Sequence, residues 1–187
     1  MVKHKIIVGI TGASGAIYAR NLLEQLGKFS DQLEEVSVIF SENAKKVWSY
    51  ELDSDSSQSL PFPVYENTDF FAPMASGSAR FDAMIICPCS MGTLGKIAHG
   101  IADNLIVRSA DVMLKERRKL ILVPRECPYN LIHLENMKSI TLAGGIIAPA
   151  NPSFYSKPGS IEELVGTVTH RVLELAGFSL ETYRWKS

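Results

Sequence analysis

A charged pair that directly follows an apolar strand is the feature of this sequence best suited to chemistry. Residues 119–124 read Lys-Leu-Ile-Leu-Val-Pro, and Arg125 and Glu126 come next. An apolar run bounded by charges is typical of a strand that is buried on both faces of a parallel sheet. Ligands of open α/β sheets bind outside the carboxyl ends of the strands. The guanidinium and the carboxylate are therefore predicted to face a ligand-binding crevice.

The turn after the first apolar strand carries glycines at a spacing that suits anion binding. Residues 9–16 read Gly-Ile-Thr-Gly-Ala-Ser-Gly-Ala. Glycine permits a tight turn and a close backbone approach, and N–H groups at a helix start attract a phosphate. The spacing differs from the G-x-G-x-x-G dinucleotide pattern, and Ala16 stands where a G-x-S-x-G nucleophile elbow needs glycine. The alternative is a plain turn in which Ser14 is the helix N-cap.

Hydroxyl side chains follow two further strands. Ser41 comes after the strand 36–40. There it either contacts a bound mononucleotide or is only the N-cap of the next helix. Ser90 and Thr93 lie at the start of the helix that follows the strand 83–87. Because parallel strands end at the same sheet edge, hydroxyl-bearing helix starts at that edge suit one mononucleotide with a phosphate.

Basic residues are so numerous that charge alone does not select a second anion site. Arg108 and Lys115 share one face of the predicted helix 104–117, with an acidic residue between them. That pattern is equally typical of a salt-bridged surface stripe. The loop 152–158 is rigid and aromatic, and it follows the last predicted strand, where it is placed to close over a pocket. Its Tyr155 is either a ligand contact or a packing aromatic.

The composition is that of a globular protein with no bias toward nucleic acid. The 187 residues are 46% hydrophobic and 21% charged, with a formal net charge of −1, whereas nucleic-acid binders show a basic excess. No apolar run is long enough for a membrane span. Cys87, Cys89 and Cys127 fit neither a zinc knuckle nor a Cys-x-x-Cys pair, and the 4 histidines have no metal-ligand spacing. We expect all three cysteines to be reduced, Cys87 and Cys89 to be small buried residues, no metal and a cytoplasmic location.

Strands and helices alternate along the whole chain, which predicts one doubly wound α/β domain over residues 1–187, with a parallel sheet between helical layers. Strands are expected at 6–10, 36–40, 83–87, 120–123 and 145–148. Pro88 is expected to end the third of them. Helices are expected at 14–26, 42–50, 90–99, 104–117, 131–142 and 161–175. The polar segment 52–60 is expected to be a loop.

Short strings along the chain occur in the order of a known family. They lie at residues 12–16, 75–78, 87–90, 104–105, 108, 110–112, 114–118, 124–126, 133–137, 152, 154–155 and 184–185. On these strings the sequence strongly resembles the flavin prenyltransferases, the UbiX-type proteins once described as aromatic acid decarboxylases. Any one string is weak, but the ordered set is specific and covers nearly the whole chain. One departure is the brief segment 52–60, where many relatives carry a longer insertion.

The resemblance implies a Rossmann-like or flavodoxin-like homo-oligomer, dodecameric in known members, with active sites between subunits. It implies reduced FMN and dimethylallyl monophosphate as substrates and no metal. The dimethylallyl group would be joined to flavin N5, and a fourth ring would then close onto C6. The product, prenylated FMN, would serve a separate UbiD-type decarboxylase.

The resemblance also assigns roles to residues of this chain. FMN would be held by Gly12, Ala13, Ser14, Ser41, Ser90, Met91, Gly92, Thr93 and Arg125. The prenyl phosphate would be bound by Lys115, Tyr155 and Arg171. Arg108 would assist, Glu126 would act in proton transfer, Ser14 would lie near the reacting flavin, and Glu51 would be a further active-site carboxylate. Either Glu126 or the released phosphate would take the C6 proton.

Three other functions are the alternatives. A short-chain nicotinamide reductase normally carries Tyr-x-x-x-Lys, but no tyrosine here has a lysine four positions later. A flavin-dependent cysteine decarboxylase belongs to the same superfamily, but the cluster 124–126 with Lys115 and Tyr155 favours a phosphate-bearing co-substrate. The third alternative, which is not an enzyme, is an FMN-binding electron carrier or a subunit of a decarboxylase complex. Such a carrier has no use for a second anion site. The effect of Lys115, Tyr155 and Arg171 on turnover would separate the carrier from the enzyme.

Overall fold

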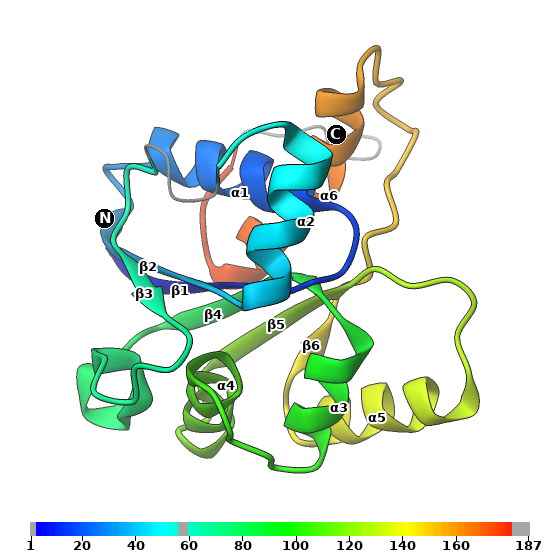
Figure 1. The fold of residues 1–187 in the computed structure, drawn as a ribbon. Helices are drawn as coiled ribbons and strands as arrows, with labels where there is room; N and C mark the ends of the chain where they lie inside the picture. Colours follow the sequence, from blue (N-terminus) through cyan, green and yellow to red (C-terminus); the bar gives the residue numbers. More distant parts are fainter. Residues whose placement is uncertain (1–2, 56–59, 181–187) are drawn as a thin grey trace.

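A computed structural model describes residues 3–55 and 60–180 (Figure 1). Its 6 strands form one parallel sheet in the order β3-β2-β1-β4-β5-β6. The strands are β1 (His4–Ile10), β2 (Leu33–Phe40), β3 (Val64–Glu66), β4 (Ala83–Cys89), β5 (Lys119–Pro124) and β6 (Ile146–Ile147). The helices are α1 (Ala16–Lys28), α2 (Glu42–Leu52), α3 (Met91–Ala98), α4 (Leu105–Lys115), α5 (Leu131–Leu142) and α6 (Ile161–Ala176), with short 3-10 helices η1 (Pro73–Ala75) and η2 (Gly77–Ala79).

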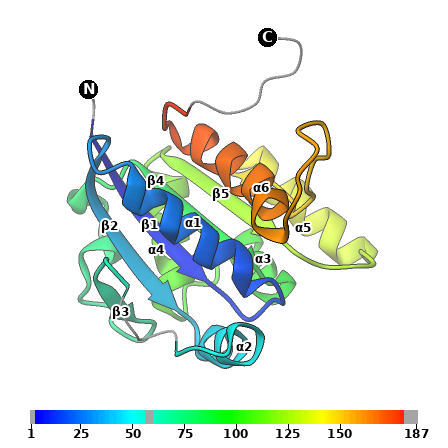
Figure 2. The ribbon, with the colours of Figure 1, turned by 90° about the horizontal axis from the view of Figure 1, so that it is seen from above.

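The sheet lies between two layers of helices because its strands are apolar on both faces. Helices α1, α2 and α6 cover one face, and α3, α4 and α5 cover the other (Figures 1 and 2). In β1, Ile6 and Val8 pack toward the first layer, whereas Ile7 packs toward the second. In β4, Ile85 packs toward the first layer and Ile86 packs toward the second. The structure confirms the predicted three-layer Rossmann-like or flavodoxin-like fold.

The predicted elements are present, with differences at their ends. The prediction that Pro88 ends its strand is wrong. Although proline lacks a ladder N–H, β4 passes it with a register shift, and Cys89 then pairs with Pro124. Helix α1 begins at Ala16 and not at residue 14, because Gly15 has a φ of 114°, a left-handed conformation that glycine tolerates. Strand β3 has no predicted counterpart, since its 3 residues carry no periodic pattern.

Part of the predicted loop 52–60 and the family string 184–185 lie outside the described residues. Helix α4 is shorter than predicted because Arg117, at a φ of 57°, has left the helical conformation. In the described part of the chain, no helix has both the length and the apolar character needed to cross a membrane.

The cysteines divide into two environments. Cys87 and Cys89 are buried in β4, and burial raises the pKa of the Cys87 thiol to about 12 and that of Cys89 further still. Both are therefore thiols at neutral pH, in keeping with their predicted role as small core residues. Cys127, by contrast, is exposed. It lies in the segment between β5 and α5.

The strand order places a switch point between β1 and β4. The chain runs outward through β2 and β3 with α1 and α2 on one face, and then returns to β4 and builds β5 and β6 with helices on the other face. In sheets of this order, ligands bind at the carboxyl edge where the direction reverses. The residues that follow β1, β2, β4 and β5 meet at this edge.

Candidate active site

A carboxylate and a guanidinium meet the first turn at the switch point. Glu51, near the end of α2, accepts hydrogen bonds from Gly15 N–H at 2.9 and 3.1 Å and from Ala16 N–H at 2.7 Å. Arg125, the residue after β5, donates from Nε to the Ser14 carbonyl oxygen at 2.7 Å. Three predicted site residues from distant parts of the sequence, Ser14, Glu51 and Arg125, therefore form one group, here called the sheet-edge group.

Glu51 accepts hydrogen bonds from the N–H groups at the start of α1 that the sequence analysis predicted to bind a phosphate. Burial pushes the pKa of the Glu51 carboxyl upward, but hydrogen bonds from the Ser14 side chain and from the N–H groups of Gly15 and Ala16, with the Arg125 charge, hold it below its ordinary value. The start of α1 is thus neutralised by a protein carboxylate. The N-cap of α1 is Gly15, so the alternative in which Ser14 is the N-cap is wrong.

We expect Glu51→Gln to lower the free energy of unfolding at neutral pH by about 1 kcal/mol, because an amide oxygen accepts weaker hydrogen bonds than a carboxylate and the site is partly screened by solvent. The pKa of the Glu51 carboxyl is lower in the folded state than in the unfolded state, where it is about 4.3. The stability that the ionised carboxylate contributes is therefore present above the unfolded-state pKa and is lost as pH falls through the folded-state pKa. Urea unfolding across that range would measure it.

The matched control for that measurement is Glu42→Gln, which removes an exposed carboxylate of α2 that pairs with Lys45 at 3.0 Å. The stability difference between wild type and Glu51→Gln should shrink as pH falls below about 4. A difference that is the same at every pH would contradict the assignment of this stability to the ionised carboxylate.

The starts of α2 and α3 carry the predicted hydroxyls. Ser41 Oγ accepts from Ala44 N–H at 3.1 Å, which confirms its N-cap role. Ser90 Oγ accepts from Thr93 N–H at 3.3 Å and donates to Thr93 Oγ1 at 3.0 Å. A Cβ placed on Gly92 would meet no atom within 4 Å, so the first turn of α3 faces open space. A ligand can approach this helix start closely.

Gly12 brings the first turn against the start of α2. A Cβ at Gly12 would lie 2.5 Å from Asn43 Cβ, so a larger residue would force the two segments apart. The contact holds the turn beside Ser41. No sequence pattern points to Asn43, because it occupies an ordinary exposed position in the first turn of a helix.

Glu126 follows Arg125 and is exposed at the same edge. Its Oε1 accepts from Cys127 N–H at 3.0 Å, which holds the carboxylate close to its own turn. Among the residues that the structure describes, no group of three or more His, Cys, Asp or Glu is placed to hold a metal ion. Glu126 and Glu51 are carboxylates at this edge with which acid–base chemistry could be done.

The predicted phosphate-binding residue Lys115 lies away from the sheet-edge group. It ends α4, just before the first residue of β5, so it is at the amino edge of the sheet, whereas Arg125 follows the carboxyl end of that strand. The 6 residues of β5 separate these edges by about 20 Å. Lys115 Nζ pairs with Glu116 at 2.9 Å.

The remaining predicted residues are also dispersed. Arg108, in the first turn of α4, donates from Nε to the Ala75 carbonyl oxygen at 3.1 Å and pairs with Asp111 at 3.0 Å. Arg171 is exposed in the half of α6 nearer the amino edge and pairs with Glu174 at 3.1 Å. Tyr155 is 65% exposed in the loop after β6. One chain therefore brings the residues predicted to hold FMN to one edge of the sheet, but it does not bring the residues predicted to hold the prenyl phosphate together there.

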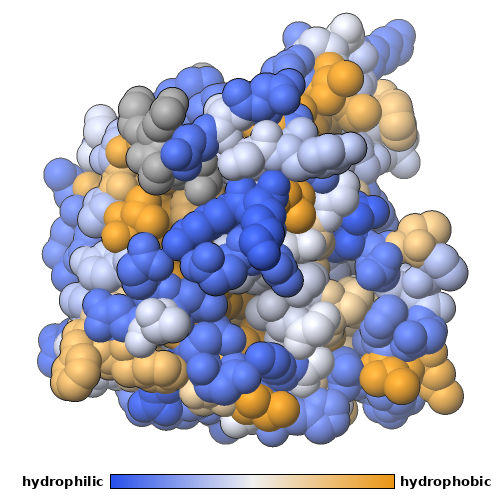
Figure 3. All heavy atoms as spheres, in the orientation of Figure 1, coloured by the Kyte–Doolittle hydropathy of each residue, from blue (hydrophilic) through white to orange (hydrophobic). Residues whose placement is uncertain are grey.

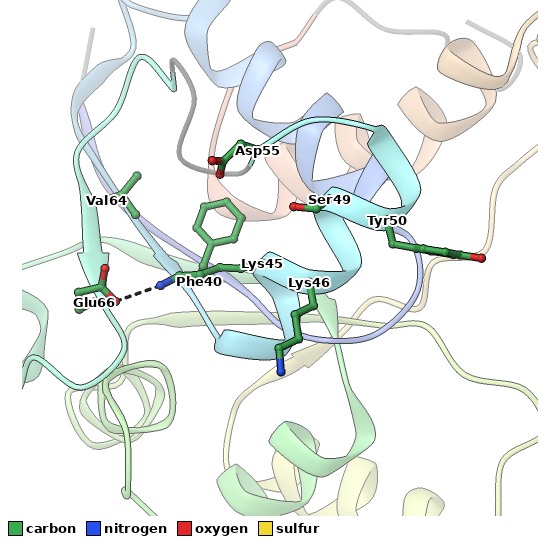
Figure 4. A pocket seen from close by; sticks show the side chains of 8 residues that line it. All are labelled: Phe40, Lys45, Lys46, Ser49, Tyr50, Asp55, Val64 and Glu66. Atoms are coloured by element: carbon green, nitrogen blue, oxygen red, sulfur yellow. Dashed lines mark hydrogen bonds and ion pairs between the residues drawn. The ribbon is translucent and has the colours of Figure 1, made fainter.

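A separate hollow of about 770 Å³ lies between α2 and β3 (Figure 4). It is lined by Phe40, Lys45, Lys46, Ser49, Tyr50, Asp55, Val64 and Glu66. Lys45 reaches across it to Glu66 at 3.1 Å. None of these residues belongs to the predicted site, and Glu51 extends from α2 toward α1 instead. The sheet-edge group is therefore the better candidate for the active site.

Comparison with known proteins identifies the family. The sequence profile of a family described as Flavoprotein matches residues 1–173. The chain is also 50% identical over 184 residues to flavin prenyltransferase UbiX of Methanocaldococcus jannaschii, which covers 97% of this chain and 98% of that protein. The chain belongs to the UbiX-type flavin prenyltransferases within the Flavoprotein family. The resemblance expected from the short strings is thereby confirmed.

Solved structures of UbiX-type proteins share the fold over the full length. The crystal structure of AnUbiX (PadA1), in complex with FMN and dimethylallyl pyrophosphate, matches with a TM-score of 0.93 at 42% identity and covers 99% of this chain and 98% of that one. A dodecameric FMN-dependent UbiX-like decarboxylase from Escherichia coli O157:H7 matches with a TM-score of 0.92 at 40% identity. The match covers 98% of this chain and 100% of that one.

Proposed function

We propose that this protein transfers a dimethylallyl group from dimethylallyl monophosphate to N5 and C6 of reduced FMN, as a single FMN-binding domain over residues 1–187. The product, prenylated FMN, would pass to a UbiD-type decarboxylase. One observation carries the proposal: Ser14, Glu51 and Arg125 converge at the switch point of a fold whose relative, AnUbiX, is 42% identical and was crystallised with FMN and dimethylallyl pyrophosphate.

In this proposal FMN lies at the carboxyl edge of the sheet, among the starts of α1, α2 and α3. When bound, reduced FMN supplies the electron-rich ring atoms to which the prenyl group is joined. Glycine at 92 leaves room for its close approach, whereas glycine at 12 lets the first turn lie against Asn43 of α2. The residues that would hold it are Gly12, Ala13, Ser14, Ser41, Ser90, Met91, Gly92, Thr93 and Arg125. Hydroxyls and a planar guanidinium suit a phosphate and a polar ring edge.

The second anion site would be completed by neighbouring copies of the chain. Lys115 and Arg171 lie far from Arg125 within one chain, so they reach a sheet-edge group only in another subunit. An assembly is supported by the apolar side chains that α5 exposes to solvent, which are Leu131, Ile132, Leu134 and Leu142. Figure 3 shows apolar atoms at the surface over this helix. We propose a homo-oligomer, with the dodecamer of the Escherichia coli relative as its size.

The charges of the proposed site fit the chemistry of an allylic phosphate. Breaking the allylic C–O bond leaves negative charge on the phosphate and positive charge on carbon. Lys115 and Arg171, with Tyr155 and assistance from Arg108, would stabilise the phosphate as that charge develops. Glu51 and Ser14 would lie beside the reacting flavin. Ring closure releases a proton from C6, which either Glu126 or the departing phosphate would accept.

Glu126→Gln is expected to keep FMN affinity and to lower turnover about 100-fold, since general-base catalysis contributes about 10²–10⁴-fold. The exposed position of Glu126 predicts that the variant folds normally. Flavin turnover and FMN titration of the same preparation would measure both quantities. Normal turnover would assign the proton to the phosphate instead.

The test of the proposed function is anaerobic incubation of the purified protein with reduced FMN and dimethylallyl monophosphate, followed by mass analysis of the flavin. A flavin heavier by one prenyl unit is the expected result. Flavin that is bound but unmodified would favour the electron carrier or another co-substrate. Failure to bind flavin would reopen the nicotinamide alternative.

A further inference from the structure

Thr11 joins two strand ends at the switch point through its hydroxyl. Thr11 Oγ1 donates to the Pro88 carbonyl oxygen at 2.8 Å and accepts from Ser90 N–H at 2.7 Å. The Thr11 N–H also donates to the Pro88 oxygen at 3.2 Å. Thr11 is 2% exposed, so water has little access to replace these hydrogen bonds.

The Thr11 hydroxyl joins β1 and β4 beyond the point where the backbone pairing of these two strands ends. The register of β1 with β4 ends at the pair Gly9 and Ile86, and the register of β4 shifts before Cys89. The segments beyond that point carry the proposed FMN residues, since Gly12 follows Thr11 and Ser90 follows Cys89. The three hydrogen bonds of Thr11 thus fix the spacing between the first turn and the start of α3.

We propose that Thr11 is a positioning residue for FMN. Its hydroxyl holds residues 12–15 and 90–93 at the separation at which both can contact one flavin. The inference rests on the proposed function, because it needs FMN to lie between these two segments. Thr11 itself is buried and would not touch the ligand. Without the hydroxyl, the Ser90 N–H loses its partner and only the bond from the Thr11 N–H to the Pro88 oxygen remains, so the start of α3 is held less firmly against the first turn.

The experiment compares three substitutions at Thr11. Thr11→Val removes the hydroxyl and keeps the volume, Thr11→Ala removes it without risk of crowding, and Thr11→Ser restores it. The dissociation constant of FMN is measured by quenching of flavin fluorescence, and stability by urea unfolding. Thr11→Val and Thr11→Ala should each raise the FMN dissociation constant about 10-fold or more, whereas Thr11→Ser should stay within about 2-fold of wild type.

The matched control is Thr169→Val, the same substitution at a site away from the sheet edge. Thr169 is 1% exposed, and its Oγ1 donates to Asn21 Oδ1 at 2.6 Å. It should lower stability and leave FMN affinity unchanged. Normal FMN affinity in both Thr11→Val and Thr11→Ala, with wild type binding FMN, would overturn this inference alone. Absence of FMN binding by wild type would overturn the proposed function and this inference together.

Discussion

Mixed oligomers of Lys115→Ala and Arg125→Ala chains should regain activity that neither variant has alone. In one chain the two residues lie at opposite edges of the sheet. If each active site takes Arg125 from one subunit and Lys115 from another, some sites of a mixed oligomer contain both natural residues. Removing one group that stabilises developing charge costs about 10²–10³-fold in rate, so each parent should be nearly inactive.

The mixture is made by co-expression, or by dissociation and reassembly, and is assayed for conversion of FMN to prenylated FMN. Its activity should exceed that of either parent by about 10-fold or more. The control mixes Arg125→Ala with Ser14→Asp, because Arg125 contacts Ser14 of the same chain at 2.7 Å and exchange of subunits cannot restore that pair. No recovery in the first mixture, or equal recovery in both, would contradict a site shared between subunits.

The sequence predicted well those elements that are determined by residues close to one another along the chain. Apolar runs long enough to be buried on both faces marked β1, β4 and β5, and the predicted parallel sheet followed from their alternation with helices. Ser41 and Ser90 were predicted at helix starts because an N-cap is read from the residues next to it. The short strand β3 and the passage of β4 through Pro88 depend on neighbouring strands, and the local pattern does not contain them.

The site was predicted as a set of residues but not as an arrangement. Glu51 reaches the N–H groups of Gly15 and Ala16 only because α2 packs against α1, and Thr11 reaches Ser90 across 79 positions of sequence. Periodicity gives no information about such contacts. The one signal for Thr11 was its place between a strand and a glycine turn, which is shared by many threonines with no role. The sequence of one chain also does not say which copy would supply Lys115 to the proposed site.

Ser14→Asp should weaken FMN binding far more than Ser14→Ala does. The Ser14 side chain hydrogen bonds to the Glu51 carboxylate, and Arg125 donates to the Ser14 carbonyl oxygen. An aspartate there sets a second carboxylate beside Glu51, near the proposed position of an anionic ligand, and competes for the Arg125 guanidinium. We expect the FMN dissociation constant to rise about 100-fold or more, equivalent to roughly 2.8 kcal/mol, against about 10-fold or less for Ser14→Ala.

Fluorescence titrations of FMN at low and high salt separate the two causes of weakened binding. Repulsion between partly exposed charges is screened by salt, so the defect of Ser14→Asp should shrink as ionic strength rises. The defect of Ser14→Ala reflects a lost hydrogen bond and should change little. Equal affinity of the two variants at low salt would show that no anionic group of FMN lies near Ser14. The phosphate would then belong nearer the starts of α2 and α3, because Glu51 already neutralises the start of α1.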